Sequence, residues 1–159
     1  MLNVNIICVG SIKEKFFTDA LNEYKKRLQR YCKFNIVELA EEKITDQETQ
    51  AQIDKTLSKE GERILAKIGK SDYVIAMCIE GKQLSSEELS QKLSEISMLS
   101  GTVDFIIGGS WGLSKDVKSR ADFRLSVSKM TFPHQLFRVM LSEQIYRAFT
   151  ITANAKYHK

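Results

Sequence analysis

The stretch RLSVSKMTFPHQLFRVMLSEQIYRAF, from Arg124 to Phe149, contains Pro133, the only proline of the chain. Proline is tolerated in the first turn of a helix because its missing N–H would have no partner there. We therefore predict a helix from Pro133 to about Thr150, with Thr131 helping to cap it. The preceding residues Val127 to Phe132 become a loop pinned between a strand and this helix. Such a loop presents backbone N–H and C=O groups, which suit the recognition of a heteroaromatic ligand through main-chain hydrogen bonds.

Outward from this stretch, short apolar runs alternate with segments of helical periodicity. The capping-box pattern of Ser85 and Glu88 starts one helix, and the polar residues 41–55 are expected to include a loop. Strands are predicted at 4–10, 34–40, 73–81, 103–109 and 123–128, and further helices at 16–30 and in a segment ending near residue 69. This alternation predicts an α/β fold, a mostly parallel sheet with helices on both faces, in a single domain over residues 1–159.

In sheets of this kind ligands bind beyond the carboxyl ends of the strands, so three loops are of interest. In the first, Gly81 is expected to end its strand, and Met77 is either an apolar floor for a ligand or plain core. The second, FIIGGSWGLSKDV, does not fit the dinucleotide pattern G-x-G-x-x-G, and a tight turn followed by a short helix is an equal alternative. Trp111 in this turn either stacks on a base or packs internally. The third is the loop before Pro133.

Composition narrows the class of protein only slightly. The net charge of +4 permits an anionic partner such as RNA without requiring one. Cys8, Cys32 and Cys78 form no C-x-x-C pair and, with two histidines in the chain, indicate small buried hydrophobes and no metal site. No segment has the roughly 20 apolar residues of a membrane span, and no export signal is recognisable. A cytoplasmic protein that does not associate with membranes is expected.

Several polar residues of the last third allow two interpretations each. Arg138 is either a clamp for substrate or phosphate, or a surface ion pair with a residue such as Glu143. His134 is either a surface residue at the helix start or part of a site. The many apolar residues of this helix indicate one face on the core and a second face for a partner subunit. By default, the terminal residues Tyr157 and His158 would fray.

The motifs GGSWGLSKDV, LSVSKMTFPHQLFRVMLSEQIYRAF and the terminal YHK closely resemble the SPOUT (α/β-knot) methyltransferase superfamily, and within it a family acting on large-subunit ribosomal RNA. VGSIKEKFFTDALNEYKKRL and EGERILAKI resemble the same family, so the likeness covers essentially the whole chain. It implies a C-terminal deep trefoil knot, S-adenosyl-L-methionine as cofactor, and a homodimer in which each site is completed by the neighbouring subunit. The implied reaction is methylation of N3 of a pseudouridine, position 1915, in 23S rRNA of the assembled ribosome.

The resemblance also assigns individual residues. Cofactor contacts fall at Met77, where the family commonly has leucine, at Gly108, and at Val127, Ser128, Lys129, Met130, Thr131 and Phe132. The Tyr157–His158 ending matches the family, so the tail is expected to fold over the active site. We rank His158 above His134 as the base that takes the N3 proton, and Arg138 is the candidate for stabilising the resulting anion.

Three alternatives remain open at the level of sequence. The first is a SPOUT methyltransferase that acts on tRNA. The second is a non-catalytic ribosome-binding protein with structural glycine loops. The third, a nucleotide-dependent oxidoreductase, is disfavoured by the glycine spacing.

Overall fold

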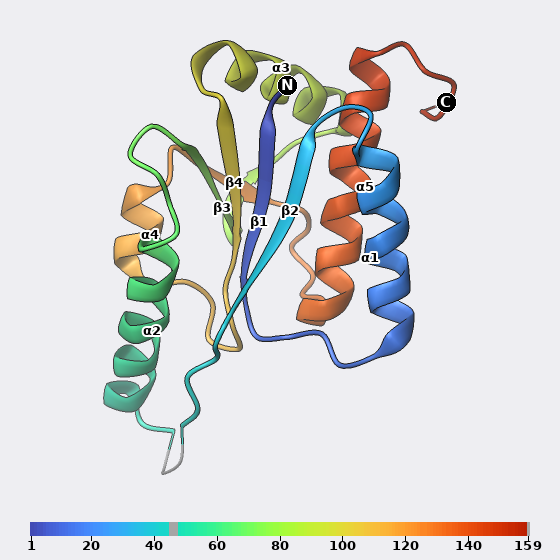
Figure 1. The fold of residues 1–159 in the computed structure, drawn as a ribbon. Helices are drawn as coiled ribbons and strands as arrows, with labels where there is room; N and C mark the ends of the chain where they lie inside the picture. The colour runs from blue at the N-terminus through green and yellow to red at the C-terminus, as the bar shows by residue number, and fades with distance from the viewer. Residues whose placement is uncertain (45–47, 159) are drawn as a thin grey trace.

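The computed structural model describes residues 1–44 and 48–158. Its centre is a five-stranded sheet in the order β2-β1-β4-β3-β5, and every neighbouring pair of strands is parallel (Figure 1). The strands are β1 (Asn3–Val9), β2 (Lys33–Leu39), β3 (Tyr73–Gln83), β4 (Thr102–Ile107) and β5 (Phe123–Ser126). The helices are α1 (Lys15–Leu28), α2 (Gln50–Leu65), α3 (Ser86–Leu99), α4 (Lys115–Arg120) and α5 (His134–Thr152). The predicted α/β class is confirmed.

Helices cover both faces of the sheet (Figure 1). On one face Val4, Ile6 and Cys8 of β1 pack with apolar residues of α1, α3 and α5. On the other face Ile7 and Val9 pack with residues of α2 and α4. The alternation along β1 is the period of two that a strand buried on both faces requires. The trefoil knot implied by the resemblance stays a prediction.

One local expectation, the end of the third strand, is wrong in detail. β3 does not end at Gly81 but continues to Gln83, with a shift in its pairing to β5 between Met77 and Lys82. Gly81 lies so close to β5 that a Cβ there would be 2.6 Å from the carbonyl carbon of Leu125. α2 begins at Gln50, capped by Thr49, and follows the loop expected within residues 41–55; residues 45–47 of that segment lie outside the described residues. The short α4, one of the alternatives considered, is present.

A buried carboxyl group, that of Asp104, lies in the middle of the sheet. Its Oδ1 accepts a hydrogen bond of 2.8 Å from Nδ2 of Asn5, and its Oδ2 has no partner among the described residues. Burial, together with the nearby carboxylate of Asp72, raises the pKa of Asp104 from 3.8 to about 6. The folded chain thus binds this proton more tightly than the unfolded chain. The resulting stabilisation is present at about pH 4 and is lost as the pH rises through about 6.

We therefore expect Asp104→Asn to stabilise the protein at pH 7.5, by about 2 kcal/mol, because no charge is then buried. Near pH 4 the two proteins should differ little. Urea unfolding at both pH values measures the difference, with Asp116→Asn on the exposed start of α4 as the control. A loss of stability at pH 7.5 would contradict this assignment.

Candidate functional site

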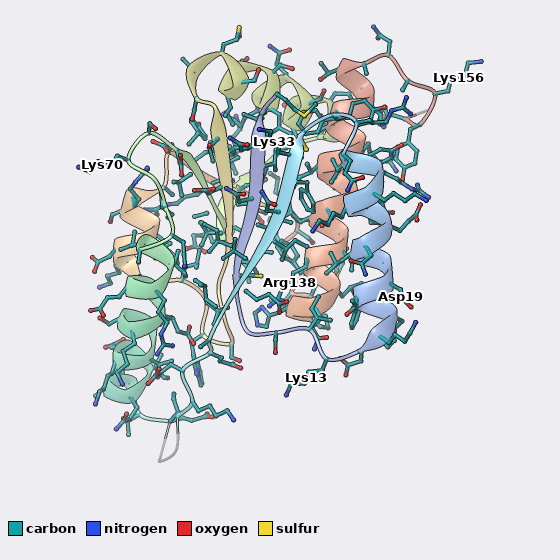
Figure 2. All side chains as sticks on the ribbon, viewed as in Figure 1. Lys13, Asp19, Lys33, Lys70, Arg138 and Lys156 are labelled. Atoms are coloured by element: carbon teal, nitrogen blue, oxygen red, sulfur yellow. The ribbon has the colours of Figure 1, made fainter. Side chains whose placement is uncertain are left out.

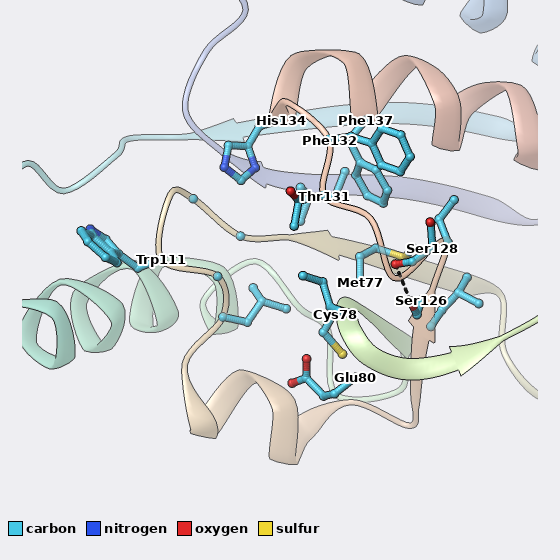
Figure 3. A pocket seen from close by; sticks show the side chains of 18 of the residues that line it. Met77, Cys78, Glu80, Trp111, Ser126, Ser128, Thr131, Phe132, His134 and Phe137 are labelled. Atoms are coloured by element: carbon cyan, nitrogen blue, oxygen red, sulfur yellow. Dashed lines mark hydrogen bonds between the residues drawn. The ribbon is translucent and has the colours of Figure 1, made fainter. Parts of the chain in front are cut away.

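The second half of β3 and the segments that follow β4 and β5 meet at the carboxyl edge of the sheet and enclose a cavity of about 530 Å³ (Figure 3). This volume lies within the usual range of small-molecule sites. The lining comes from residues 77–80, 107–113, 118, 125–128, 130–132, 134 and 137. The sheet thus brings together the three stretches chosen from the sequence, although the first of them lines the cavity as part of β3 and not as a loop. Of the eight residues assigned to the cofactor, only Lys129 is outside the lining.

The glycine turn after β4 is folded tightly back on itself. A Cβ on Gly108 would lie 2.2 Å from the carbonyl oxygen of Gly112, which leaves no room for any other residue. Gly112 has φ +83°, a backbone conformation in which a residue with a side chain would be strained. Its N–H donates to the carbonyl of Gly109 at 3.1 Å. Leu113 and Val117 then anchor the chain in the core. The turn is therefore fixed in shape at the point where it lines the cavity.

Two acidic residues support this turn from behind. Glu60 of α2 is buried with its Oε2 3.1 Å from the place where a Cβ on Gly109 would be, and its Oε1 accepts the N–H of Glu42 at 3.1 Å. Burial raises the pKa of Glu60. The hydroxyl of Ser110 donates to Oε1 of Glu41 at 3.3 Å. Sequence reasoning missed both carboxylates, because nothing in the pattern of α2 marks Glu60 as buried.

Serine side chains fix the loop between β5 and α5. The Ser126 hydroxyl donates to the carbonyl of Ser128 at 3.1 Å, and Ser128 Oγ accepts the N–H of Met130 at 3.0 Å (Figure 3). The capping role predicted for Thr131 is wrong, because Pro133 is the N-cap of α5 and no side chain caps the helix. Pro133 therefore precedes the helix instead of occupying its first turn. Thr131 lines the cavity instead.

One wall of the cavity carries polar groups that the sequence analysis did not single out. Glu80 and Lys118 form an ion pair there, and the hydrogen bond from Lys118 lowers the pKa of Glu80. Cys78 is half-buried beside them, so the expectation of three fully buried cysteines holds only for Cys8 and Cys32. Burial raises the pKa of the Cys78 thiol, which therefore stays protonated at neutral pH.

His134 and Arg138 lie one helical turn apart at the start of α5. His134 lines the cavity, and packing around its ring and the positive charge of Arg138 lower its pKa. Arg138 is only 1% exposed and is outside the lining. Figure 2 labels it beside the start of α5. Its Nη2 donates to the carbonyls of Val9 and Gly10, both at 2.9 Å, and its Nη1 pairs with Glu38 at 3.2 Å.

Arg138 thus ties α5 to the end of β1. The alternative of a surface ion pair with Glu143 is wrong, since Glu143 pairs with Arg147 at 2.7 Å.

The C-terminal tail lies at the other end of α5 from His134 (Figure 1). The Tyr157 hydroxyl donates to Oε1 of Glu143 at 3.2 Å, and His158 Nε2 lies 2.7 Å from Oε1 of Glu87 in α3. Burial and the Glu143 carboxylate raise the pKa of Tyr157 to about 12, so its phenol remains a donor. The tail packs on α5 and α3, so it does not fray, and it lies away from the pocket of its own chain. Its expected position over an active site stays a prediction.

A parallel sheet with helices on both faces defines the chain as an α/β protein. A solved structure is similar to it in fold. The structure of "a probable methylase family protein" from Haemophilus influenzae Rd KW20 is similar with a TM-score of 0.56 at 14% identity, over 99% of this chain and 71% of that one. At this identity the similarity concerns the fold alone. No helix of the described residues is long and apolar enough to cross a membrane, and no group of three potential metal ligands occurs among them.

The family model described as "Predicted SPOUT methyltransferase" matches residues 2–158, and the chain belongs to this family of methyltransferases. Two curated relatives, from Leuconostoc mesenteroides and Clostridium acetobutylicum, are 51% and 50% identical to it. In both cases the match covers 99% of this chain and 100% of the relative. Both relatives are named ribosomal RNA large subunit methyltransferase H.

Proposed function

We propose that the protein transfers a methyl group from S-adenosyl-L-methionine to N3 of the pseudouridine at position 1915 of 23S rRNA in the assembled ribosome. The coarser conclusion, an rRNA methyltransferase, follows from its family and from full-length relatives of that name at about 50% identity. One structural observation supports the finer proposal. The three loops that the resemblance assigns to the cofactor enclose a single cavity at the carboxyl edge of the sheet.

The residues of the cavity fit this cofactor. Met77, Ile107 and Leu125 provide apolar walls, while the turn at Gly108 and the loop at Ser128 expose backbone groups that read a heteroaromatic ring. The bound cofactor supplies an electrophilic methyl group on a sulfonium. The task of the chain is therefore to hold the reacting groups in line and to exclude water. Lys129, which is exposed beside the cavity, is better placed for RNA phosphate than for the cofactor.

An imide nitrogen such as N3 must lose its proton to attack, and His134 is our candidate for the base. Among the described residues it is the histidine that lines the cavity, and its lowered pKa keeps it neutral near pH 7. We assign Arg138 a positioning role: its guanidinium holds the first turn of α5 and its charge lowers the pKa of His134.

We further propose that His158 and Tyr157 reach a pocket only in a homodimer, from the tail of the second copy. The tail lies away from the pocket of its own chain, and a second cavity of about 460 Å³ flanks the β5–α5 loop on the α5 side. Val139 and Met140 line it without being fully buried, and Leu136 is exposed one turn earlier. An apolar face of this kind suits a second copy of the chain.

The function is tested with labelled S-adenosylmethionine on ribosomes from cells that lack the gene, on deproteinised rRNA and on tRNA, with the modified nucleotide mapped by mass spectrometry. We expect label at N3 of one pseudouridine in ribosomes and none in free rRNA. Label in tRNA would show that the protein is a methyltransferase whose substrate is tRNA and not 23S rRNA. The absence of both label and cofactor binding would leave a non-catalytic ribosome-binding protein.

A base with a lowered pKa predicts a particular pH dependence of kcat/KM. The neutral imidazole persists at lower pH, so the acid limb of the profile should have its midpoint below 6.5, the ordinary value for histidine. His134→Ala should lower kcat by roughly 10²-fold or more and remove this limb. His158→Ala serves as the comparison. If His158→Ala removes the limb and His134→Ala keeps it, the base is His158.

A further inference from the structure

Trp111, the only tryptophan of the chain, lies at the tip of the glycine turn after β4. It lines the mouth of the cavity with 40% of its surface exposed. Figure 3 shows the indole at the outer edge of the pocket, apart from Met77, Ser126 and Ser128. A large aromatic side chain normally contributes by burying its surface, so this exposure needs an explanation.

The turn holds Trp111 in place from both sides. The residue before it, Ser110, donates a hydrogen bond to the carboxylate of Glu41. The residue after it, Gly112, donates its N–H to the carbonyl of Gly109. Leu113 is then buried in the core. The indole is therefore carried by a backbone of fixed shape, and its exposure does not come from a loose loop.

Within residues 1–44 and 48–158 the indole has no aromatic or cationic partner. The stacked and edge-on aromatic pairs of the described chain involve residues of α1, α5 and the adjoining segments, and none includes Trp111. No arginine or lysine lies over its ring in that part of the chain. Within these residues neither an aromatic ring nor a cation therefore covers a face of the indole.

The surroundings of Trp111 match an unpaired nucleobase. A base that is to be methylated at N3 must leave its pairing and stacking to reach the methyl donor, and aromatic side chains commonly receive such bases. Ile79 and Met130 are exposed at the same cavity and extend the apolar rim. Lys115, four residues after Trp111, and Lys129, in the facing loop, are exposed cations suited to phosphates.

We propose that Trp111 is a stacking platform for a nucleobase of the RNA substrate at the mouth of the cofactor pocket. This inference rests on the proposed function, since it presumes an RNA substrate. The deep residues Met77 and Gly108 are assigned to the cofactor, so the indole at the rim contacts substrate. The stacked base contributes to RNA binding and to holding the target nucleotide extrahelical, and takes no part in binding the cofactor.

The test compares Trp111→Ala and Trp111→Phe with Met98→Ala, a control on an exposed apolar residue of α3. We expect Trp111→Ala to lower kcat/KM for ribosomes by about 10-fold or more, within the range measured for lost base stacking. Trp111→Phe should restore most of this loss, and the Kd for S-adenosylmethionine should stay within about twofold in both variants, since stacking involves only the RNA. An unchanged kcat/KM, or a parallel loss of cofactor affinity, would overturn the proposal.

Because Trp111 is the single tryptophan, its fluorescence also measures RNA binding directly, without depending on catalysis. Binding of a short oligouridylate should quench the fluorescence of Trp111 in a saturable way. If the wild-type protein methylates no rRNA, the proposed function fails, and this titration alone decides the inference. Saturable quenching would then uphold stacking, and fluorescence unchanged up to millimolar oligouridylate would overturn it.

Discussion

Gly108→Ala should strongly weaken cofactor binding while leaving the protein folded. The added Cβ would lie 2.2 Å from the carbonyl oxygen of Gly112 and 2.5 Å from its carbonyl carbon, so backbone must move. The turn that moves is the one that lines the cavity, and a displacement of about 1 Å is enough to cost roughly 10²-fold in a positioned site. We expect the Kd for S-adenosylmethionine to rise by about that factor or more, measured by calorimetry.

Gly101→Ala is the matched control for this substitution. Gly101 directly precedes β4, whereas Gly108 directly follows it, and a Cβ at Gly101 would meet nothing within 4 Å. The control should bind the cofactor as the wild-type protein does. Circular dichroism and the Tm of Gly108→Ala separate a displaced turn from an unfolded chain. Wild-type affinity in Gly108→Ala would show that the cofactor does not use this turn.

Arg138→Ala should cause a large loss of stability. The guanidinium is 1% exposed and donates to the carbonyls of Val9 and Gly10. Its removal takes this donor from both oxygens and leaves Oε2 of Glu38 with only the N–H of Ile12. Removing one partner of a buried charged group typically costs 3–5 kcal/mol, and we expect about 3 kcal/mol because Glu38 keeps contact with water. Urea unfolding at pH 7.5 measures the loss.

Arg27→Ala provides the comparison, since Arg27 forms an exposed i,i+4 ion pair with Glu23 on α1. Its effect should be far smaller than that of Arg138→Ala, because exposed ion pairs contribute little. The pH dependence of kcat/KM in Arg138→Ala tests the positioning role of Arg138. Loss of the Arg138 charge should raise the pKa of His134 and move the acid limb of kcat/KM to higher pH. Equal stability in Arg138→Ala and Arg27→Ala would contradict the buried role.

The sequence predicted the strands and two of the site loops, those after β4 and β5, because these depend on local signals. The first expected site loop is instead part of β3. β-branched runs that end in glycine mark β1 and β4, and the sheet then brings the carboxyl ends of its strands to one edge. The cap at Ser85 was likewise local and is confirmed, with both of its hydrogen bonds present. The resemblance narrowed the class of protein further, and the family match over residues 2–158 confirms it.

What the sequence could not predict depends on partners distant along the chain. Arg138 contacts groups 100 or more positions away, at Glu38, Val9 and Gly10, so no nearby residue indicated that it is buried. Glu60 supports the glycine turn through a contact between α2 and the end of β4. The position of the tail depends on Glu87 and Glu143, on two helices that only the fold brings together.

The most direct test of the cofactor site uses the methionines of the chain as reporters. The chain has five methionines, and Met77 and Met130 line the cavity, whereas Met1 and Met98 do not. In protein carrying ¹³C-methyl methionine, S-adenosylmethionine should shift the methyl signals of Met77 and Met130 and leave those of Met1 and Met98 in place. Saturation that shifts Met1 or Met98 while Met77 and Met130 stay unchanged would contradict the location of the site.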